Sequence, residues 1–213
     1  MAGRANPRMG DKVIICGTKY ELVQNISAQR GYQFRTWLVK DFSNQKRYVA
    51  KITEDRNKAL NELRTYTYLK TERYPDRYYA EMLAFDHKAK LVRDDKPQKK
   101  TFNVILLRYL PSDRFQGLDE YLRGSSSEHE EDIIEMLVEK LRRRVEMLHE
   151  LGVSHGDIRL ANIMVEVTED KSVTVKLIDL GLSGFGDEVA MARDNRQTER
   201  IAKRLLKRVE LID

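Results

Sequence analysis

Two short segments of the sequence contain side chains that could bind a metal ion and move a proton. In HGDIRLANIM, residues 155–164, Asp157 precedes Asn162 by five positions, and Asp179 follows in LIDLG after the apolar run VKLI. Asp and Asn supply oxygen ligands of the kind that Mg²⁺ prefers, and a carboxylate can accept a proton from a hydroxyl group. These residue types could serve a reaction in which a metal ion neutralises charge and a carboxylate accepts a proton.

An upstream lysine and glutamate could form an ion pair. Lys51 lies near the end of the run YVAKI, and Glu62 lies on one helical stripe with three apolar residues. A carboxylate on an apolar stripe needs a cationic partner, because a buried unpaired charge is costly. We favour the pairing of Glu62 with Lys51, for which Glu54 and Asp55 compete.

Each of these residues also has an ordinary structural explanation. Asp157 could form a turn after Gly156, and Lys51 could be an exposed lysine at the end of a strand. Asn162 could cap a helix, and Asp179 could lie in a turn that ends a strand. These explanations account for the residues one at a time, but they leave the joint spacing unexplained.

The composition indicates a folded, well-charged protein. Apolar residues make up 41% of the 213 residues and charged residues 34%, an ordinary globular balance. The single cysteine, Cys16, excludes an internal disulfide. The absence of a secretory signal and of a membrane-spanning apolar run favours a cytoplasmic or nuclear protein that is not secreted. A net charge of +5 suits an anionic partner without choosing one.

The first half of the chain has the pattern of a sheet with one helix. Runs rich in β-branched and aromatic residues, separated by polar turns, predict an antiparallel meander over residues 20–26, 32–40 and 47–52. The apolar period then becomes helical over residues 55–70. Two further apolar runs flank a polar hairpin loop, so we expect about five strands and one helix in this half.

The second half is expected to be mainly helical. A short helix follows Pro111, and a long helix is predicted through Leu148, with Gly152 placed to end it. The loop 155–164 and a pair of short strands lead to a closing helix within residues 187–213. The apolar residues of that helix would pack inward, with its Arg and Lys residues outward.

The motifs, taken in order, resemble those of the protein-kinase-like superfamily. HGDIRLANIM matches the catalytic-loop pattern H-x-D-x-x-x-x-N, LIDLG matches D-F-G with Leu180 in place of phenylalanine, and YVAKI matches V-A-I-K. The match runs from about Tyr20 to Gly181. The H-G-D variant is similar to small atypical kinases: the kinase subunit of the tRNA threonylcarbamoylation complex, RIO-type kinases, and aminoglycoside or choline kinases.

The resemblance implies an α+β, bilobal protein-kinase-like fold. A flexible N-terminus, residues 1–12, would precede an N-lobe of antiparallel sheet plus one helix, residues 13–110. A truncated, mainly helical C-lobe, residues 111–213, would carry the catalytic loop and the closing helix. ATP and Mg²⁺ would bind between the two lobes.

The resemblance also implies roles for residues of the second half. Asp157 would accept or orient the hydroxyl proton of the acceptor, and Arg159 could steady the γ-phosphate. Asn162 and Asp179 would be the Mg²⁺ ligands. His155 would be a packed, hydrogen-bonded loop histidine, because its family counterpart is structural.

ATP would be held by residues of the first half and of the linker that follows it. Lys51 would bind the α- and β-phosphates, and Glu62 would orient Lys51. Arg108 and Leu110, in the linker LLRYLPS, would bind adenine through backbone groups. Gly31 is the one glycine of SAQRGYQF, where the family has a glycine-rich loop over the phosphates.

Three departures from the family pattern shape the functional prediction. Gly156 replaces the arginine of H-R-D, so control through a phosphorylated activation loop is not expected. Only 32 residues follow Gly181, without an A-P-E motif, so the peptide-docking platform is expected to be missing. The short C-terminal region and the glycine-poor loop favour a pseudokinase, whereas the intact catalytic set favours an enzyme.

We therefore predict an ATP- and Mg²⁺-dependent phosphotransferase of the serine/threonine kinase type, an atypical minimal kinase that transfers the γ-phosphate to a hydroxyl acceptor. A protein is the favoured acceptor, with an RNA-associated factor or a small molecule left open. The alternative is a pseudokinase-type binding or regulatory module with weak or no catalysis. A third and weaker hypothesis, RNA binding, rests on the pI near 9.2 and the basic tail; no membrane partner is expected.

Overall fold

The structure, a computed structural model, describes residues 6–27, 35–124 and 130–209. The chain forms two compact units, of which the first comprises Met1–Leu63 and Glu81–Tyr109 and the second comprises Arg64–Ala80 and Leu110–Asp213. The division falls inside one helix, α1 (Arg56–Thr71). Each unit buries its own apolar residues, as independent folding units do.

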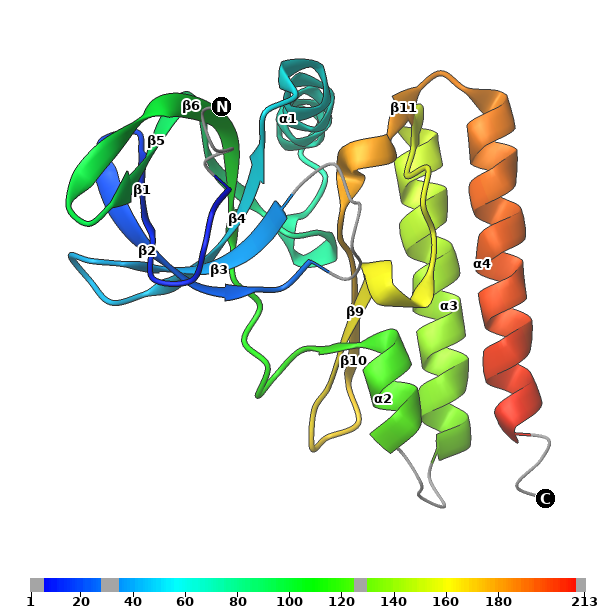
Figure 1. The fold of residues 1–213 in the computed structure, drawn as a ribbon. Helices are drawn as coiled ribbons and strands as arrows, with labels where there is room; N and C mark the ends of the chain where they lie inside the picture. Colours follow the sequence, from blue (N-terminus) through cyan, green and yellow to red (C-terminus); the bar gives the residue numbers. More distant parts are fainter. Residues whose placement is uncertain (1–5, 28–34, 125–129, 210–213) are drawn as a thin grey trace. The chain divides into compact units, whose positions relative to one another are not determined.

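Six strands of the first unit close into an antiparallel barrel, in the order β1-β2-β3-β4-β6-β5 (Figure 1). The strands are β1 (Lys12–Ile15), β2 (Thr18–Asn25), β3 (Arg35–Asp41), β4 (Arg47–Thr53), β5 (Met82–Arg93) and β6 (Lys96–Arg108). The predicted meander corresponds to β2, β3 and β4. The sequence pattern does not predict β1, whose four residues pair with β2 and whose first three also pair with β5, which closes the barrel.

Alternation along β4 decides which of its side chains face the barrel core. Ala50 and Ile52 are buried in that core. Since successive side chains of a strand point to opposite faces, Lys51 points away from the core. It is nevertheless only 4% exposed.

The residues that directly precede β1 are held to the barrel. Of the segment expected to be a flexible leader, residues 1–5 lie outside the described part of the chain. Asp11 is buried, and its carboxylate accepts hydrogen bonds from Arg93 Nε at 2.8 Å and Arg93 Nη2 at 2.6 Å. Its Oδ2 also accepts the Arg8 N–H at 2.9 Å. These bonds connect the start of the described chain to β5.

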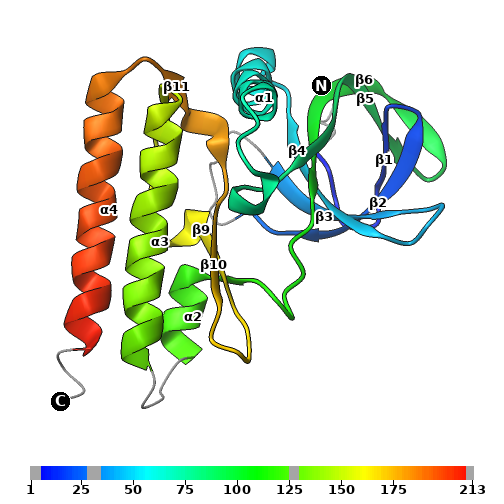
Figure 2. The same cartoon turned by 180° about the vertical axis from the view of Figure 1, so that it is seen from behind.

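The second unit is mainly helical, as predicted, and adds short strands and turns (Figure 2). Its helices are the end of α1, α2 (Leu118–Gly124), α3 (Glu130–Glu150) and α4 (Glu188–Val209). Its strands are β7 (Gln116–Gly117), β8 (Val153–Ser154), β9 (Ile163–Val167), β10 (Val173–Leu177) and β11 (Gly184–Phe185). Its 3-10 turns are η1 (Asp76–Tyr78), η2 (Leu160–Asn162) and η3 (Leu180–Leu182).

Helices α3 and α4 lie side by side and run in opposite directions (Figures 1 and 2). The buried apolar residues of α3 recur at spacings of three and four: Ile134, Leu137, Leu141, Val145 and Leu148. The buried stripe of α4 contains Asp194 in addition to Thr198, Ile201, Ala202 and Leu205. None of the helices in the described ranges is long and apolar enough to cross a membrane.

Candidate active site

The loop between β8 and β9 holds Asp157 and Asn162 in direct contact. Asn162 Nδ2 donates to the Asp157 carbonyl oxygen at 2.9 Å and to Asp157 Oδ2 at 2.8 Å. Arg159 Nε lies 3.0 Å from the same Oδ2 and forms an ion pair with it. Because both neighbours use Oδ2, the second carboxylate oxygen, Oδ1, is the one placed to accept a proton from a hydroxyl group.

Asp179 lies beside this loop because β9 and β10 pair in register. Ile163 pairs with Leu177, and the Ile178 N–H donates to the Asn162 carbonyl oxygen at 3.0 Å. Asn162 and Asp179 therefore flank the same end of a two-stranded ladder. The backbone turns at Asp179 in the left-handed conformation, with φ 66° and ψ 71°.

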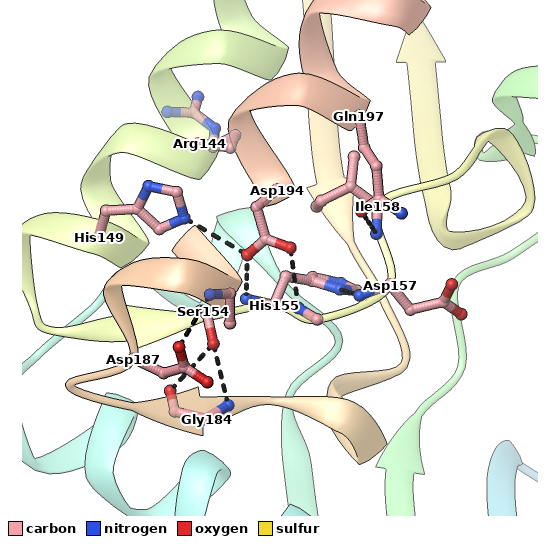
Figure 3. A network of polar contacts seen from close by, with 12 residues as sticks. Arg144, His149, Ser154, His155, Asp157, Ile158, Gly184, Asp187, Asp194 and Gln197 are labelled. Atoms are coloured by element: carbon pink, nitrogen blue, oxygen red, sulfur yellow. Dashed lines mark hydrogen bonds and ion pairs between the residues drawn. The ribbon is translucent and has the colours of Figure 1, made fainter. Parts of the chain in front are cut away.

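A buried carboxylate on α4 binds the loop that follows β8 (Figure 3). Asp194 is 0% exposed. Its Oδ2 accepts the His155 N–H at 2.6 Å, and its Oδ1 accepts the Gly156 N–H at 3.0 Å. His149 Nε2 lies 3.3 Å from Oδ2. The carboxylate thus satisfies two buried N–H groups that need an acceptor.

A second residue of α4 bonds the same loop. Gln197 Oε1 accepts the Ile158 N–H at 3.2 Å, on the loop side of the helix (Figure 3). Neither Gln197 nor Asp194 was predicted from the sequence. The available signal was the position of Asp194, four and seven residues before Thr198 and Ile201, on the stripe of α4 that faces inward.

His155 is a fully buried neutral imidazole. Its Nε2 lies 3.1 Å from the Ile178 carbonyl oxygen, and its Nδ1 lies 3.3 Å from the Asp157 nitrogen. A carbonyl needs a donor and a backbone N–H needs an acceptor, so the proton is on Nε2. Burial lowers the pKa of His155, against the opposing effect of nearby carboxylates, which agrees with this neutral form. The packed role expected for His155 fits this geometry.

Only a short segment connects Asp179 to α4. Turn η3 follows Asp179 directly, and Gly184 and Phe185 of β11 then pair with Ser154 and Val153 of β8. Helix α4 begins three residues after Phe185, at Glu188. This segment is therefore paired, backbone to backbone, with the strand that leads into the catalytic loop.

In the first unit, Lys51 and Glu62 form a buried ion pair. Lys51 Nζ lies 2.6 Å from Glu62 Oε1 and 2.8 Å from Oε2, and the two residues are 4% and 0% exposed. The two competitors are engaged elsewhere: Glu54 pairs with Lys100, and Asp55 caps the start of α1. The favoured pairing of Glu62 with Lys51 is therefore present in the structure.

The residues expected to contact adenine and to cover the phosphates are placed less favourably. The Arg108 N–H already donates to the Glu81 carbonyl oxygen at 2.8 Å, and Arg108 Nε pairs with the Glu81 carboxylate at 2.6 Å. The N–H of Arg108 is therefore not available to a nucleotide, which leaves Leu110 as the candidate donor. Gly31 lies outside the described residues.

The donor set at the end of the β9–β10 ladder fits Mg²⁺. The described residues contain no group of three or more His, Cys, Asp and Glu side chains that could hold a metal ion by themselves. Mg²⁺ does not need such a group, since it commonly takes one or two protein oxygens and completes its shell with water and phosphate. Asn162 and Asp179 provide an amide oxygen and a carboxylate of this kind.

The first unit is a barrel with a buried Lys–Glu pair. The second is a helical unit in which an Asp–Asn loop lies beside a second aspartate. These features are typical of a kinase-type domain. A family profile described as "Protein kinase domain" matches residues 39–200, more than half of the chain. The chain belongs to the protein kinase domain family. The predicted fold class and superfamily are therefore confirmed.

Individual relatives agree with this assignment at low identity. "Probable serine/threonine-protein kinase 2" of Plasmodium falciparum (isolate K1 / Thailand) is 30% identical over 94 residues, which cover 44% of this chain and 18% of that protein. The crystal structure of the BubR1 kinase domain matches with a TM-score of 0.60 and 15% identity, over 84% of this chain and 52% of that chain. The chain thus spans about half or less of the proteins it matches.

Proposed function

We propose that the protein is an ATP- and Mg²⁺-dependent phosphotransferase that transfers the γ-phosphate to a hydroxyl group, most simply on a protein. The observation that carries the proposal is the arrangement of Asp157, Asn162 and Asp179, joined by a hydrogen bond and by strand pairing at one end of the β9–β10 ladder. An accidental H-x-D sequence would have no reason to be held in this way by a buried carboxylate such as Asp194.

The geometry of each unit supports a role for each residue. Asp157 Oδ1 would orient the acceptor hydroxyl and take its proton, while Asn162 and Arg159 keep the carboxylate in place through Oδ2. Asn162 and Asp179 would hold Mg²⁺, which when bound neutralises charge on the phosphates. In the first unit, Glu62 fixes Lys51, whose ammonium group would bind the α- and β-phosphates.

The experiment compares the wild type with Asp157→Asn and Asp179→Asn in a nucleotide titration with and without Mg²⁺ and in a transfer assay with labelled ATP. Asp157→Asn should retain Mg·ATP binding and reduce transfer by about two to four decades, the usual contribution of a positioned acid or base. Asp179→Asn should weaken the Mg²⁺-dependent part of nucleotide binding as well as transfer, because it removes a charged ligand.

The same assay distinguishes the enzyme from a pseudokinase. A wild-type protein that transfers no phosphate to itself or to any lysate protein, with Asp157→Asn indistinguishable from it, would favour the binding module. Equal weakening of Mg·ATP binding by both substitutions would contradict the division of roles between Asp157 and Asp179. Asp170→Asn is a suitable control, since Asp170 lies in the exposed turn between β9 and β10.

A further inference from the structure

One face of α4 carries a straight stripe of five cations. The stripe consists of Arg193, Arg196, Arg200, Arg204 and Lys207, all exposed. Their spacings of three, four, four and three residues place them within about 80° of arc and along about 21 Å of helix. In the described part of the chain no carboxylate forms an ion pair with any of the five.

The two acidic residues of α4 that lie within the length of the stripe are engaged elsewhere. Asp194 is buried against the catalytic loop. Glu199 bonds Arg142 of α3 through both carboxylate oxygens, at 2.7 and 2.6 Å, and lies on the other shoulder of the helix. Like charges three and four residues apart destabilise a helix by a few tenths of a kcal/mol per pair. The stripe therefore has an energetic cost that α4 itself does not offset.

The position of the stripe is fixed by the contacts on either side of it. Ile201 and Leu205 are buried, so the apolar face of α4 is already covered within the unit. Gln197 bonds Ile158 in the catalytic loop on one flank, and Glu199 bonds α3 on the other. The stripe lies on the remaining, outward side, where a long partner could contact all five cations together.

We propose that this stripe binds the phosphate backbone of duplex RNA. Arginine guanidinium groups match phosphate oxygens in geometry as well as in charge, and evenly spaced cations suit a partner with evenly spaced anions. A folded protein partner would need an apolar or aromatic centre for tight binding, and no side chain of the stripe provides one. A single strand would need aromatic side chains for base stacking, which the stripe also lacks.

RNA fits the stripe better than B-form DNA does. A helix in the major groove of DNA faces a phosphate strand on both flanks, whereas the five cations of the stripe lie on one side of α4 and Glu199 lies toward the other, with Lys203 four residues from it. Duplex RNA instead presents a wide, shallow minor groove, which proteins contact across its surface through phosphates and 2′-hydroxyl groups. The proposal does not depend on catalysis, because no residue of the stripe belongs to the catalytic set.

The test is fluorescence anisotropy with a labelled RNA duplex of about 20 base pairs, at salt concentrations from about 50 to 200 mM. Replacing Arg196, Arg200 and Arg204 together by Gln should weaken binding by about tenfold or more and lower the slope of log K against log salt by about two to three. The matched control replaces Lys88, Lys90 and Lys96, exposed cations of β5 and β6, by Gln and removes the same charge. This control should retain nearly wild-type affinity.

Two further variants complete the design. The single change Arg200→Gln, which should leave the fold intact, is expected to lower the salt slope by about one. Asp157→Asn should bind RNA like the wild type, whatever happens to phosphate transfer. Equal losses of RNA affinity in the two triple variants would show that only the net charge of the protein matters, and would overturn the proposal. Absence of RNA binding, or equally tight binding of a DNA duplex or of polyglutamate, would overturn it as well.

Discussion

Gly156 lies against the carbonyl group of Leu182, so closely that a Cβ added to the glycine would be 2.1 Å from that oxygen. Gly156 also has a φ of 83°, a conformation that other L residues rarely adopt. The catalytic loop and turn η3 can therefore make this contact only if a glycine stands between His155 and Asp157. This contact is a steric reason for H-G-D where most family members have H-R-D.

We predict that Gly156→Ala lowers the free energy of unfolding by about 2–5 kcal/mol, from backbone strain together with the clash against Leu182. Gly152→Ala is the matched control, since Gly152 has a φ of 71° but nothing within 4 Å of an added Cβ. That change should cost only the strain, about 1–2 kcal/mol. Chemical denaturation of both variants measures the difference, and equal costs would show that the Leu182 contact contributes nothing.

Asp194→Asn should destabilise the loop more than its small change in shape suggests. An Asn side chain has one acceptor oxygen, so the N–H of either His155 or Gly156 would face an NH₂ group. We expect a loss of about 1.5–3 kcal/mol, with faster amide exchange at residues 155 and 156. Glu199→Gln, on the exposed face of the same helix, should change stability by less than about 1 kcal/mol. Unchanged exchange at the two amides would remove Asp194 from this role.

The Lys51–Glu62 pair allows stability and chemistry to be separated. Lys51→Met leaves a buried carboxylate without its cation and should cost about 3–5 kcal/mol. Adding Glu62→Met should restore most of that stability, because an apolar pair of similar volume is often tolerated. Nucleotide binding should stay weak in both variants, since the ammonium group that we propose to bind phosphate is absent. Lys12→Met breaks the more exposed pair with Asp95 and should cost less than about 1 kcal/mol.

The buried imidazole of His155 predicts a loss of stability in acid. Burial lowers its pKa below the ordinary value of 6.5. As the pH falls through about 6.5, His155 is therefore protonated in the unfolded chain before it is protonated in the folded chain. The unfolded state then binds more protons, and the free energy of unfolding should fall as the pH drops below about 6.5. Thermal unfolding measured between about pH 7.5 and 5.5 follows the effect.

His155→Asn should be less stable than the wild type at neutral pH but should show a smaller loss on acidification, because the substituted side chain does not titrate in this range. His87→Gln is the control at an exposed position of β5 and should keep the wild-type pH dependence. If His155→Asn retains the full acid slope, other groups cause it.

Some residues of the candidate site could be predicted because short sequence motifs mark them. Asp157 and Asn162 lie in one loop, and Asp179 follows an apolar strand that pairs back to that loop. Lys51 was predicted from its place after Val49 and Ala50 in YVAKI, and its neighbours Ala50 and Ile52 fill the barrel. The pairing with Glu62 required only that α1 follow β4 with its charged residue on the apolar stripe.

The parts that escaped prediction depend on contacts between residues distant in sequence. Asp194 stands among charged residues in the segment RDNRQ and resembles a solvated helix residue until its burial is known. Its partner His155 lies 39 residues away. The contact of Gly156 with Leu182 is likewise a matter of tertiary packing. No local period or propensity marks such contacts, because they exist only after the helices have packed.

The left-handed backbone at Asp179 has a consequence for the sequences that this fold can accept. A φ of 66° suits glycine best and asparagine next, so the backbone alone would prefer either residue to aspartate. In a library selected only for folded protein, Gly and Asn should therefore accumulate at this position. A library selected for phosphate transfer should keep Asp. The difference in residue frequencies at position 179 between the two libraries would measure the stability that is lost by keeping a carboxylate there.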